Sequence, residues 1–359
     1  MTSRDRIAAI LRREVPDRMG LYEHFWPETL NAEWPAQGYP SGVSPEVEFD
    51  YDIAGCGGWF ASEPFPGRYE VVAETDEWRI ARDGRGASLK HWKAKSGTPE
   101  HIGFDCDTPD KWRTYREPLL EVNPSRLDFA GARAALQGAR ERGKYAVFGN
   151  LFVFELLRAT LGDANFLPAL LVEPDWIRDF CRVYLNHFRS HYDLLFREAG
   201  KPDGMFIYED FGFANGLFCS PRTLAEVIMP YEKELVGFFH DHGLPVVLHA
   251  CGDVRKAVPL FIEAGFDCLQ PMEAKAGCDV VELARTYGTK LAYMGNMNVV
   301  ALSTNDRTVV EAEVAPKLAA LRDMRIPYVF HSDHSVPPDI RLDTYRYALE
   351  LLRVHGSYA

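Results

Sequence analysis

Short apolar runs alternate with amphipathic helical patterns along most of the chain, and the alternation is clearest from residue 145 onward. The runs are short and largely apolar, without the polar residue at every second position that marks a strand with one exposed face. Such runs are typical of parallel strands that helices cover on both faces. Strands are therefore expected at 19–23, 145–149, 205–208, 246–249, 267–270, 291–295 and 328–331.

Helix boundaries between these runs can be read from the sequence. Ser220 and Pro221 supply an N-cap and a first-turn proline for a helix expected to continue to about Asp241, where Gly243 ends it. Asp306 can cap a later helix in the same way. Because strands alternate with helices and no Gly-rich dinucleotide-binding fingerprint is present, the pattern favours an α/β fold of the closed (β/α)₈ TIM-barrel type over a doubly wound sheet.

Residues 24–144 do not follow the βα repeat. Within them, residues 70–93 resemble an antiparallel β meander with a turn at Asp83 and Gly84. We interpret the segment as an insertion or lid on a single barrel domain of residues 1–359, and not as a second domain. Its many aromatic residues either line a pocket or simply pack the insertion onto the barrel.

Composition narrows the class of protein. The 359 residues are 47% hydrophobic and 26% charged, and no run approaches the roughly 20 apolar residues of a membrane span. A cytoplasmic protein is expected, with an amphipathic helix and no signal peptide at its start. The net charge of −12 argues against non-specific binding to nucleic acid, which requires a basic surface. The scattered cysteines lack paired spacing, so a disulfide scaffold is not expected.

Ionisable and polar residues gather directly after the predicted strands. In a (β/α)₈ barrel these positions share one rim, where the active sites of such barrels lie. Glu209 and Asp210 present adjacent carboxylates, one of which can act as a general acid or orient a metal-binding imidazole; for Asp210, capping of the next turn is the alternative. His331 is a further catalytic candidate, unless a backbone group holds it. Residues expected to contact substrate are Tyr22, His24, Phe25, Tyr208 and Asn296.

His249 and Cys251 form the sharpest motif, and they directly follow a predicted strand. Side chains two residues apart in an extended chain share a face, so both can reach one metal ion. Zinc accepts imidazole and thiolate together, and a catalytic zinc has three protein ligands and an open position. The third ligand must come from another strand end, where His334 is the first candidate and Glu273 the second.

Taken in order, these segments resemble the uroporphyrinogen decarboxylase superfamily, and more closely its cobalamin-dependent methyltransferase branch. The resemblance covers essentially the whole chain and is strongest from residue 202 to 356. The superfamily has a (β/α)₈ barrel, in agreement with the alternation of strands and helices. The matching segments include Glu209-Asp210, Met229-Pro-Tyr231, His249-Ala-Cys-Gly-Asp253, Gly295-Asn-Met297 and Asp333-His-Ser-Val-Pro-Pro338.

Two porphyrinogen-binding segments of the decarboxylases have no counterpart here. These enzymes resemble one another in an arginine-rich N-terminal segment and in a Phe-Ser-Asp segment. The corresponding regions read Arg18-Met-Gly-Leu-Tyr-Glu-His24 and Ile53-Ala-Gly-Cys-Gly57. A pocket without those arginines would not neutralise a polycarboxylate, so porphyrinogen decarboxylation is not expected.

The methyltransferase branch binds zinc through a His-x-Cys pair and a later cysteine. His249 and Cys251 match the pair, and His334 stands where the later cysteine falls, with Glu273 as a fourth or substituting ligand. The resemblance implies a Zn²⁺ ion that polarises the heteroatom of a small methylated substrate while a corrinoid (cobalamin) on a partner protein takes the methyl group. An imidazole in place of a thiolate makes zinc a stronger Lewis acid, which suits an ether oxygen such as that of a methoxylated aromatic.

Two other functions stay open at this point. A metal-independent decarboxylase or lyase acting on a smaller acid would use Asp210 and His334 as acid and base. A non-catalytic barrel that binds a small molecule or a partner is less compatible with titratable groups at so many strand ends. A homodimer is an expectation drawn from the family alone.

Overall fold

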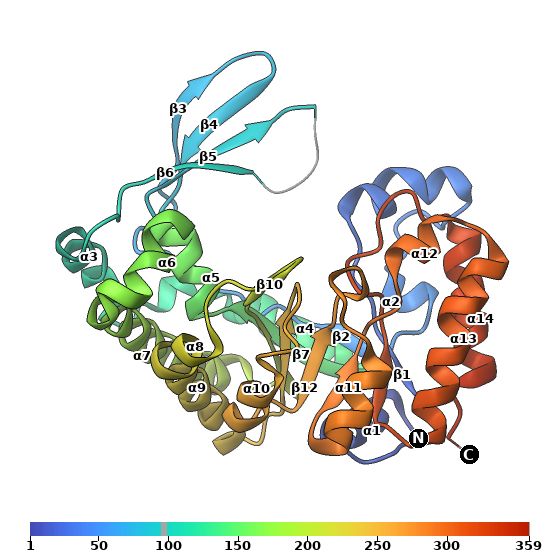
Figure 1. Ribbon diagram of the computed structural model, residues 1–359. Helices are drawn as coiled ribbons and strands as arrows, with labels where there is room; N and C mark the ends of the chain where they lie inside the picture. Colours follow the sequence, from blue (N-terminus) through green and yellow to red (C-terminus); the bar gives the residue numbers. More distant parts are fainter. Residues whose placement is uncertain (95–98, 359) are drawn as a thin grey trace.

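A barrel of parallel strands organises the chain, whose computed structural model describes residues 1–94 and 99–358. The sheet has eight strands in the spatial order β1-β14-β13-β12-β11-β8-β7-β2 (Figure 1). Its two ends meet where the N–H of Asp52 donates to the carbonyl of Leu21 at 2.9 Å. The predicted (β/α)₈ barrel is therefore confirmed. The strands are β1 (Gly20–Leu21), β2 (Ile53–Gly55), β7 (Tyr145–Leu151), β8 (Gly204–Tyr208), β11 (Val246–Ala250), β12 (Cys268–Pro271), β13 (Ala292–Met294) and β14 (Tyr328–Phe330).

β2 is a barrel strand that the sequence pattern did not reveal. It contains only three residues, and Gly57 and Gly58, each with a φ of 80°, follow it closely. Such a short apolar run does not stand out from its surroundings. Because β2 belongs to the barrel wall, the predicted insertion at 24–144 is divided into two segments, one on each side of this strand. Residues 95–98 of the second segment, and Ala359 at the chain end, lie outside the described residues.

Helices cover the outside of the barrel. The cap predicted at Ser220 is confirmed, since its Oγ accepts the N–H of Thr223 at 3.0 Å. The helix expected up to Asp241 is broken into α8 and α9, because Pro230 has no N–H to continue the helical hydrogen bonds. The helices are α1 (Ser3–Leu11), α2 (Pro45–Glu48), α3 (Pro109–Tyr115), α4 (Phe129–Glu141), α5 (Val153–Leu161), α6 (Asp163–Val172), α7 (Pro174–Ala199), α8 (Pro221–Val227), α9 (Met229–Asp241), α10 (Val258–Ala264), α11 (Val280–Tyr287), α12 (Val299–Ser303), α13 (Arg307–Asp323) and α14 (Leu342–His355).

The predicted β meander is confirmed and is longer than expected. An antiparallel sheet contains β3 (Glu70–Glu74), β4 (Trp78–Arg82), β5 (Ala87–Trp92) and β6 (Glu100–Phe104) in sequence order. In Figure 1 this sheet stands apart from the barrel, on the side of α5 and α6. Phe104 packs so closely on Gly162, between those two helices, that a Cβ there would overlap the ring. This contact joins the insertion to the barrel.

Side chains inside the barrel form apolar layers below a polar one. α1 closes the amino-terminal end, where Ile7 and Ile10 belong to the inner core cluster. Because side chains alternate along a strand, the residues two positions beyond the inward apolar ones also face inward. The inward apolar residues include Val147, Phe206, Val247, Cys268 and Val329. The polar layer at the carboxyl ends therefore contains Tyr208, His249, Gln270 and His331.

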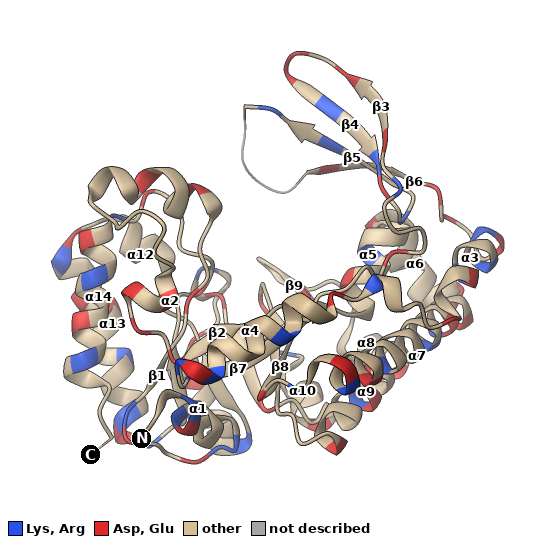
Figure 2. Ribbon diagram, turned by 180° about the vertical axis from the view of Figure 1, so that it is seen from behind, with Lys and Arg blue, Asp and Glu red and all other residues tan. Residues whose placement is uncertain are grey.

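The outer faces of the helices carry mixed charge. Figure 2 shows both basic and acidic positions along the ribbons of α13 and α14. Ion pairs join neighbouring helices, as between Arg182 of α7 and Glu234 of α9 at 2.7 Å. None of the helices in the described residues has the length and apolar character needed to cross a bilayer.

Candidate active site

Cys251 lies at the centre of the polar rim, directly after β11. With Asp210 and His249 it forms one set of metal-ligand atoms that lie within 4.8 Å of one another. Cys251 forms a second such set with Glu273 and His334. The four predicted metal ligands are thus gathered around one thiol, and Asp210 joins them. We call these five residues the rim cluster.

The two histidines of the rim cluster belong to different sets. Nε2 of His249 lies 3.3 Å from Sγ of Cys251, whereas His334 forms a set with Cys251 and Glu273. The predicted trio of His249, Cys251 and His334 therefore does not form a single set in this arrangement. Each set supplies the three protein ligands that a catalytic zinc requires.

Asp210 connects the two residues of the His-x-Cys motif. Its Oδ1 accepts the N–H of Cys251 at 3.0 Å and lies 3.4 Å from Nε2 of His249. Burial opposes ionisation of this carboxyl, but the His249 ring and the Cys251 N–H outweigh it and lower the pKa of Asp210 to about 2. Asp210 is therefore an anion that contacts both residues of the motif; its role in orienting the imidazole stays a prediction.

The donor atoms of the rim cluster fit a zinc ion. Burial raises the pKa of the Cys251 thiol well above its usual range, and the carboxylates of Asp210 and Glu273 raise it further. A thiol in such surroundings ionises only beside a cation, because the two neighbouring carboxylates already bring negative charge to the site. Imidazole, thiolate and carboxylate are the ligand types that zinc accepts.

His334 and Glu273 are held by neighbours on the open side of the cluster. The ring of His334 stacks on Trp26, with ring centres 5.9 Å apart and planes 17° from parallel. Glu273 is 8% exposed, and its Oε1 lies 4.0 Å from Nζ of Lys275. Trp26, which follows β1, therefore forms part of the wall beside this half of the cluster.

A hydrogen-bonded layer lies directly behind His249. Nδ1 of His249 lies 2.5 Å from Oε1 of Gln270, and Nε2 of Gln270 lies 3.3 Å from Nε2 of His331. His331 in turn lies 2.9 Å from Nδ1 of His24, whose Nε2 meets the hydroxyls of Tyr22 at 3.4 Å and Tyr208 at 3.3 Å. Of the predicted substrate contacts, Tyr22, His24 and Tyr208 thus lie together in this layer.

His331 does not occupy the position of a catalytic acid or base. Its side chain is 0% exposed, and Nδ1 lies 2.6 Å from the carbonyl of Ser332. Burial lowers the pKa of His331 to about 3 and that of His24 well below its usual value. Both rings are neutral at physiological pH, and His331 is held by a backbone group, which was the alternative to its catalytic role.

Glu209 does not share the surroundings of Asp210. Its two carboxylate oxygens accept the backbone N–H groups of Phe154 at 3.0 Å and Glu155 at 2.8 Å, at the amino-terminal end of α5. Burial and the neighbouring Glu232 raise the pKa of Glu209 well above its usual value. The predicted catalytic role does not fit this position, where Glu209 satisfies the unpaired N–H groups of a helix start.

Two predicted substrate contacts also have other partners. Asn296 is 0% exposed, and its amide bonds to backbone groups of Met272, Cys278 and Val280. The ring of Phe25 packs on Trp34 and Tyr345, with ring centres 5.1 and 5.7 Å away. Asn296 therefore joins loops, whereas Phe25 is partly buried and packs against the core.

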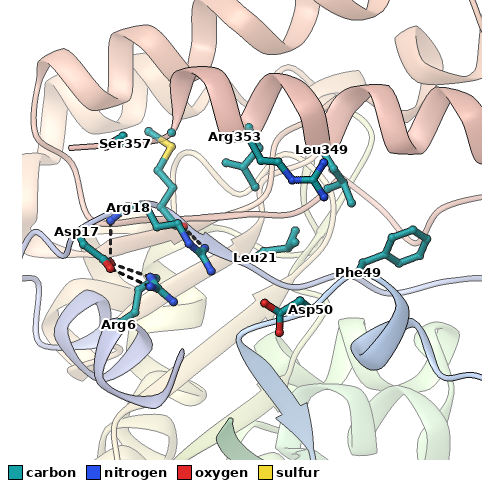
Figure 3. Close-up of a pocket in the computed structure, with 12 residues that line it drawn as sticks. Arg6, Asp17, Arg18, Leu21, Phe49, Asp50, Leu349, Arg353 and Ser357 are labelled. Atoms are coloured by element: carbon teal, nitrogen blue, oxygen red, sulfur yellow. Dashed lines mark hydrogen bonds and ion pairs between the residues drawn. The ribbon is translucent and has the colours of Figure 1, made fainter. Parts of the chain in front are cut away.

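A cavity of about 510 Å³ lies at the amino-terminal end of the barrel, away from the rim cluster (Figure 3). Arg6 and Arg18 are among its lining residues. The guanidinium of Arg18 donates to Asp52 at 2.9 and 3.0 Å. Arg18 comes from the segment that corresponds to the porphyrinogen-binding arginines of the decarboxylases, and here it is held at the wrong end of the barrel to serve a substrate at the rim.

Gln270 is the residue of this site that sequence reasoning missed. It was assigned to the apolar interior of a strand, and a single glutamine in such a run gives little signal. Its position two residues after the inward-facing Cys268 was the available clue, since alternation places both side chains inside the barrel. In the parallel pairing of β11 and β12, Gln270 lies opposite His249.

The barrel and its rim cluster match one family model. The model described as uroporphyrinogen decarboxylase (URO-D) matches residues 161–355, which is more than half of the chain. The chain belongs to the uroporphyrinogen decarboxylase family. The match includes every member of the rim cluster, but not the first three barrel strands, β1, β2 and β7.

A methyltransferase from Methanosarcina mazei shares the fold of this URO-D family member over nearly its full length. The two structures align over 99% of each chain with a TM-score of 0.70 and 14% sequence identity. At that identity the likeness shows the fold alone. A family 2 AP endonuclease from Brucella melitensis aligns over 60% of this chain and 81% of its own with a TM-score of 0.32 and 12% identity, too little for any structural argument. No curated protein sequence matches the chain.

Proposed function

We propose that this URO-D family member is a zinc-dependent methyltransferase, which moves a methyl group between a small methylated substrate and a corrinoid carried by a partner protein. The observation that carries the proposal is the gathering of Asp210, His249, Glu273 and His334 around Cys251 at the carboxyl ends of the strands. The family membership and the fold shared with a methyltransferase support it.

Zinc would be held by Cys251 together with His249, Glu273 and His334, and Asp210 would be an alternative carboxylate ligand. A bound zinc supplies Lewis acidity, which makes the heteroatom of a methylated substrate a better leaving group. Asp210 keeps the motif in place through the N–H of Cys251. Trp26 holds the ring of His334 by stacking.

Aromatic side chains around the cluster favour a small, neutral substrate. The ring of Tyr208 lies 5.0 Å from that of His249 and 5.4 Å from that of Trp59. Apolar walls with a few placed polar groups are the usual construction of a small-ligand site, and they keep water from the reacting atoms. We therefore propose a methoxylated aromatic or a similar compound in preference to a polycarboxylate, for which Arg18 is not available.

The corrinoid would be brought by a second protein. The barrel and its insertion account for the described residues, and the rim of the barrel is the side from which both substrate and corrinoid would have to reach the cluster. Docking of a partner at this rim would place its cofactor against the substrate.

The test combines metal analysis with a transfer assay. Purified protein is analysed for zinc and then assayed for methyl transfer to reduced cobalamin from methoxyarenes, methylamines and methanol. Cys251→Ser should lose both zinc and transfer, because the thiol belongs to both ligand sets. Cys219→Ser changes a half-buried thiol outside the rim cluster and should retain both.

Two results would contradict the proposal. One is Cys251→Ser protein that binds zinc and transfers methyl groups as well as the wild type. The other is metal-free protein that releases carbon dioxide from a small organic acid and loses this activity on substitution of Asp210 or His334. The second result would establish the decarboxylase alternative.

A further inference from the structure

We infer that Gln270 positions His249 for metal binding, by accepting the proton of Nδ1 and so leaving Nε2 free to face the metal. The inference rests on the proposed function, because it concerns His249 as a ligand. It follows from a series of hydrogen bonds in which each donor is determined by the neighbour before it. The series begins at a backbone carbonyl and ends in the rim cluster.

The first link is the carbonyl of Ser332. A carbonyl oxygen only accepts, so Nδ1 of His331, at 2.6 Å, must donate to it. A neutral imidazole carries one proton, and Nε2 of His331 is then an acceptor. The ring is 0% exposed, and burial without solvent favours this neutral form.

His24 agrees with this assignment. Its Nδ1 lies 2.9 Å from Nε2 of His331, so Nδ1 carries the proton of His24 and donates it. Nε2 of His24 is then an acceptor for the hydroxyls of Tyr22 and Tyr208, each of which can donate. Both rings therefore carry their proton on Nδ1.

An ionised Glu23 would reverse the donor and acceptor roles in this series of hydrogen bonds. Its Oε1 lies 3.3 Å from Nε2 of His331, and an ion pair between them would put a proton on that nitrogen. Both side chains are 0% exposed, and burial raises the pKa of Glu23 to about 8 while it lowers that of His331 to about 3. Both effects favour the neutral forms and the direction given above.

Gln270 connects His331 to His249 and extends the same order of donors and acceptors. Nε2 of His331 carries no proton, and its one lone pair is shared between Nδ1 of His24 and the NH₂ of Gln270, at 3.3 Å. The amide oxygen then faces Nδ1 of His249, at 2.5 Å. An oxygen that only accepts places a proton on Nδ1. Nε2 of His249 therefore faces the rim cluster, 3.3 Å from Sγ of Cys251 and 3.4 Å from Oδ1 of Asp210.

Gln270 is therefore a positioning residue, and its loss should weaken metal binding before it affects folding. In Gln270→Leu, Nδ1 of His249 loses its acceptor, so both the ring orientation and the tautomer become free. We expect zinc affinity, measured on the full chain by competition with a chromogenic chelator, to fall by about 10- to 100-fold. Gln270→Glu keeps an acceptor for Nδ1 but loses the NH₂ that faces His331, so its zinc affinity should lie between those of the wild type and Gln270→Leu.

A surface glutamine provides the matched control. Gln137 is exposed on α4, where its amide donates to Glu141, and Gln137→Leu should leave the zinc affinity unchanged. Circular dichroism establishes that each variant is folded. A Gln270→Leu protein that is folded and binds zinc as tightly as the wild type would show that the inference is wrong.

A second measurement does not depend on zinc. The ring nitrogens of His249 are observed by ¹⁵N NMR of metal-free protein near neutral pH and are identified by their loss in His249→Gln. We expect Nδ1 to be protonated in the wild type and to lose part of this protonation in Gln270→Leu. An Nδ1 without a proton in the wild type would overturn the inference. A wild type that binds no zinc but shows the Nδ1 tautomer would instead overturn the proposed function.

Discussion

Asp52 holds two arginines at the closed end of the barrel, and Asp52→Asn is expected to destabilise the fold by about 3–4 kcal/mol. The carboxylate is 0% exposed. It accepts hydrogen bonds from Arg6 at 2.8 Å, from Arg18 at 2.9 and 3.0 Å, and from the N–H of Leu21 at 2.9 Å. The substitution keeps the size of the side chain and removes its charge and one of its acceptor oxygens.

The magnitude follows from the partners that Asn cannot satisfy. An Asn oxygen in place of Oδ1 retains Arg6, but the NH₂ group in place of Oδ2 then faces the Leu21 N–H and one Arg18 nitrogen, which are both donors. An unpaired buried N–H costs about 1–3 kcal/mol. Removal of one partner from a buried ion pair costs about 3–5 kcal/mol. The total stays near the lower figure because Arg6 keeps Asp17 at 2.8 Å and Arg18 is 37% exposed.

Urea unfolding followed by circular dichroism and fluorescence measures the effect. The free energy of unfolding should fall with an unchanged dependence on urea, so that only the midpoint moves. Asp110→Asn is the control, since Asp110 and its partner Arg113 are 84% and 70% exposed and the loss should be less than about 1 kcal/mol. A loss of under about 1 kcal/mol in Asp52→Asn would refute the reasoning.

Two further predictions concern pH and backbone geometry. Burial lowers the pKa of His187 to about 3. The unfolded chain therefore binds a proton that the folded protein excludes, and the free energy of unfolding decreases as the pH falls below about 6.5. In His187→Leu this decrease should be smaller by up to about 1.4 kcal/mol per pH unit, measured by unfolding at several pH values. An unchanged slope would contradict this, and His355→Leu, at a half-exposed site, is the control. Gly295→Ala should cost about 2–3 kcal/mol, because φ is 119° and a Cβ would overlap the Pro271 carbonyl. Gly38→Ala, in the left-handed helical region with φ 90° and open space around it, should cost only about 1–2 kcal/mol, and equal unfolding midpoints for the two variants would disprove the difference.

The adjacent carboxylates show how far sequence reasoning reaches at the site. The prediction that Glu209 and Asp210 follow a barrel strand is confirmed, and Asp210 does contact the His-x-Cys motif. Glu209, its neighbour, instead binds the start of α5. Two adjacent residues after a strand end can have entirely different partners, and the choice between them depends on which helix packs against that strand.

The sequence by itself determined the barrel fold. Largely apolar runs between amphipathic helices are a local signal, and they place polar residues such as His249 and His334 at one rim of the barrel. β2 escaped notice because three residues are too few to show a period.

Only the tertiary structure decided the partners of each polar residue. Distant segments of the chain decide these partners. The amide of Asn296 bonds to loop backbone, Phe25 packs against the core, and His331 is held by a backbone carbonyl. Gln270 became part of the site because parallel pairing places it opposite His249. The register between strands that lie far apart in sequence depends on closure of the whole barrel, and no local pattern contains it.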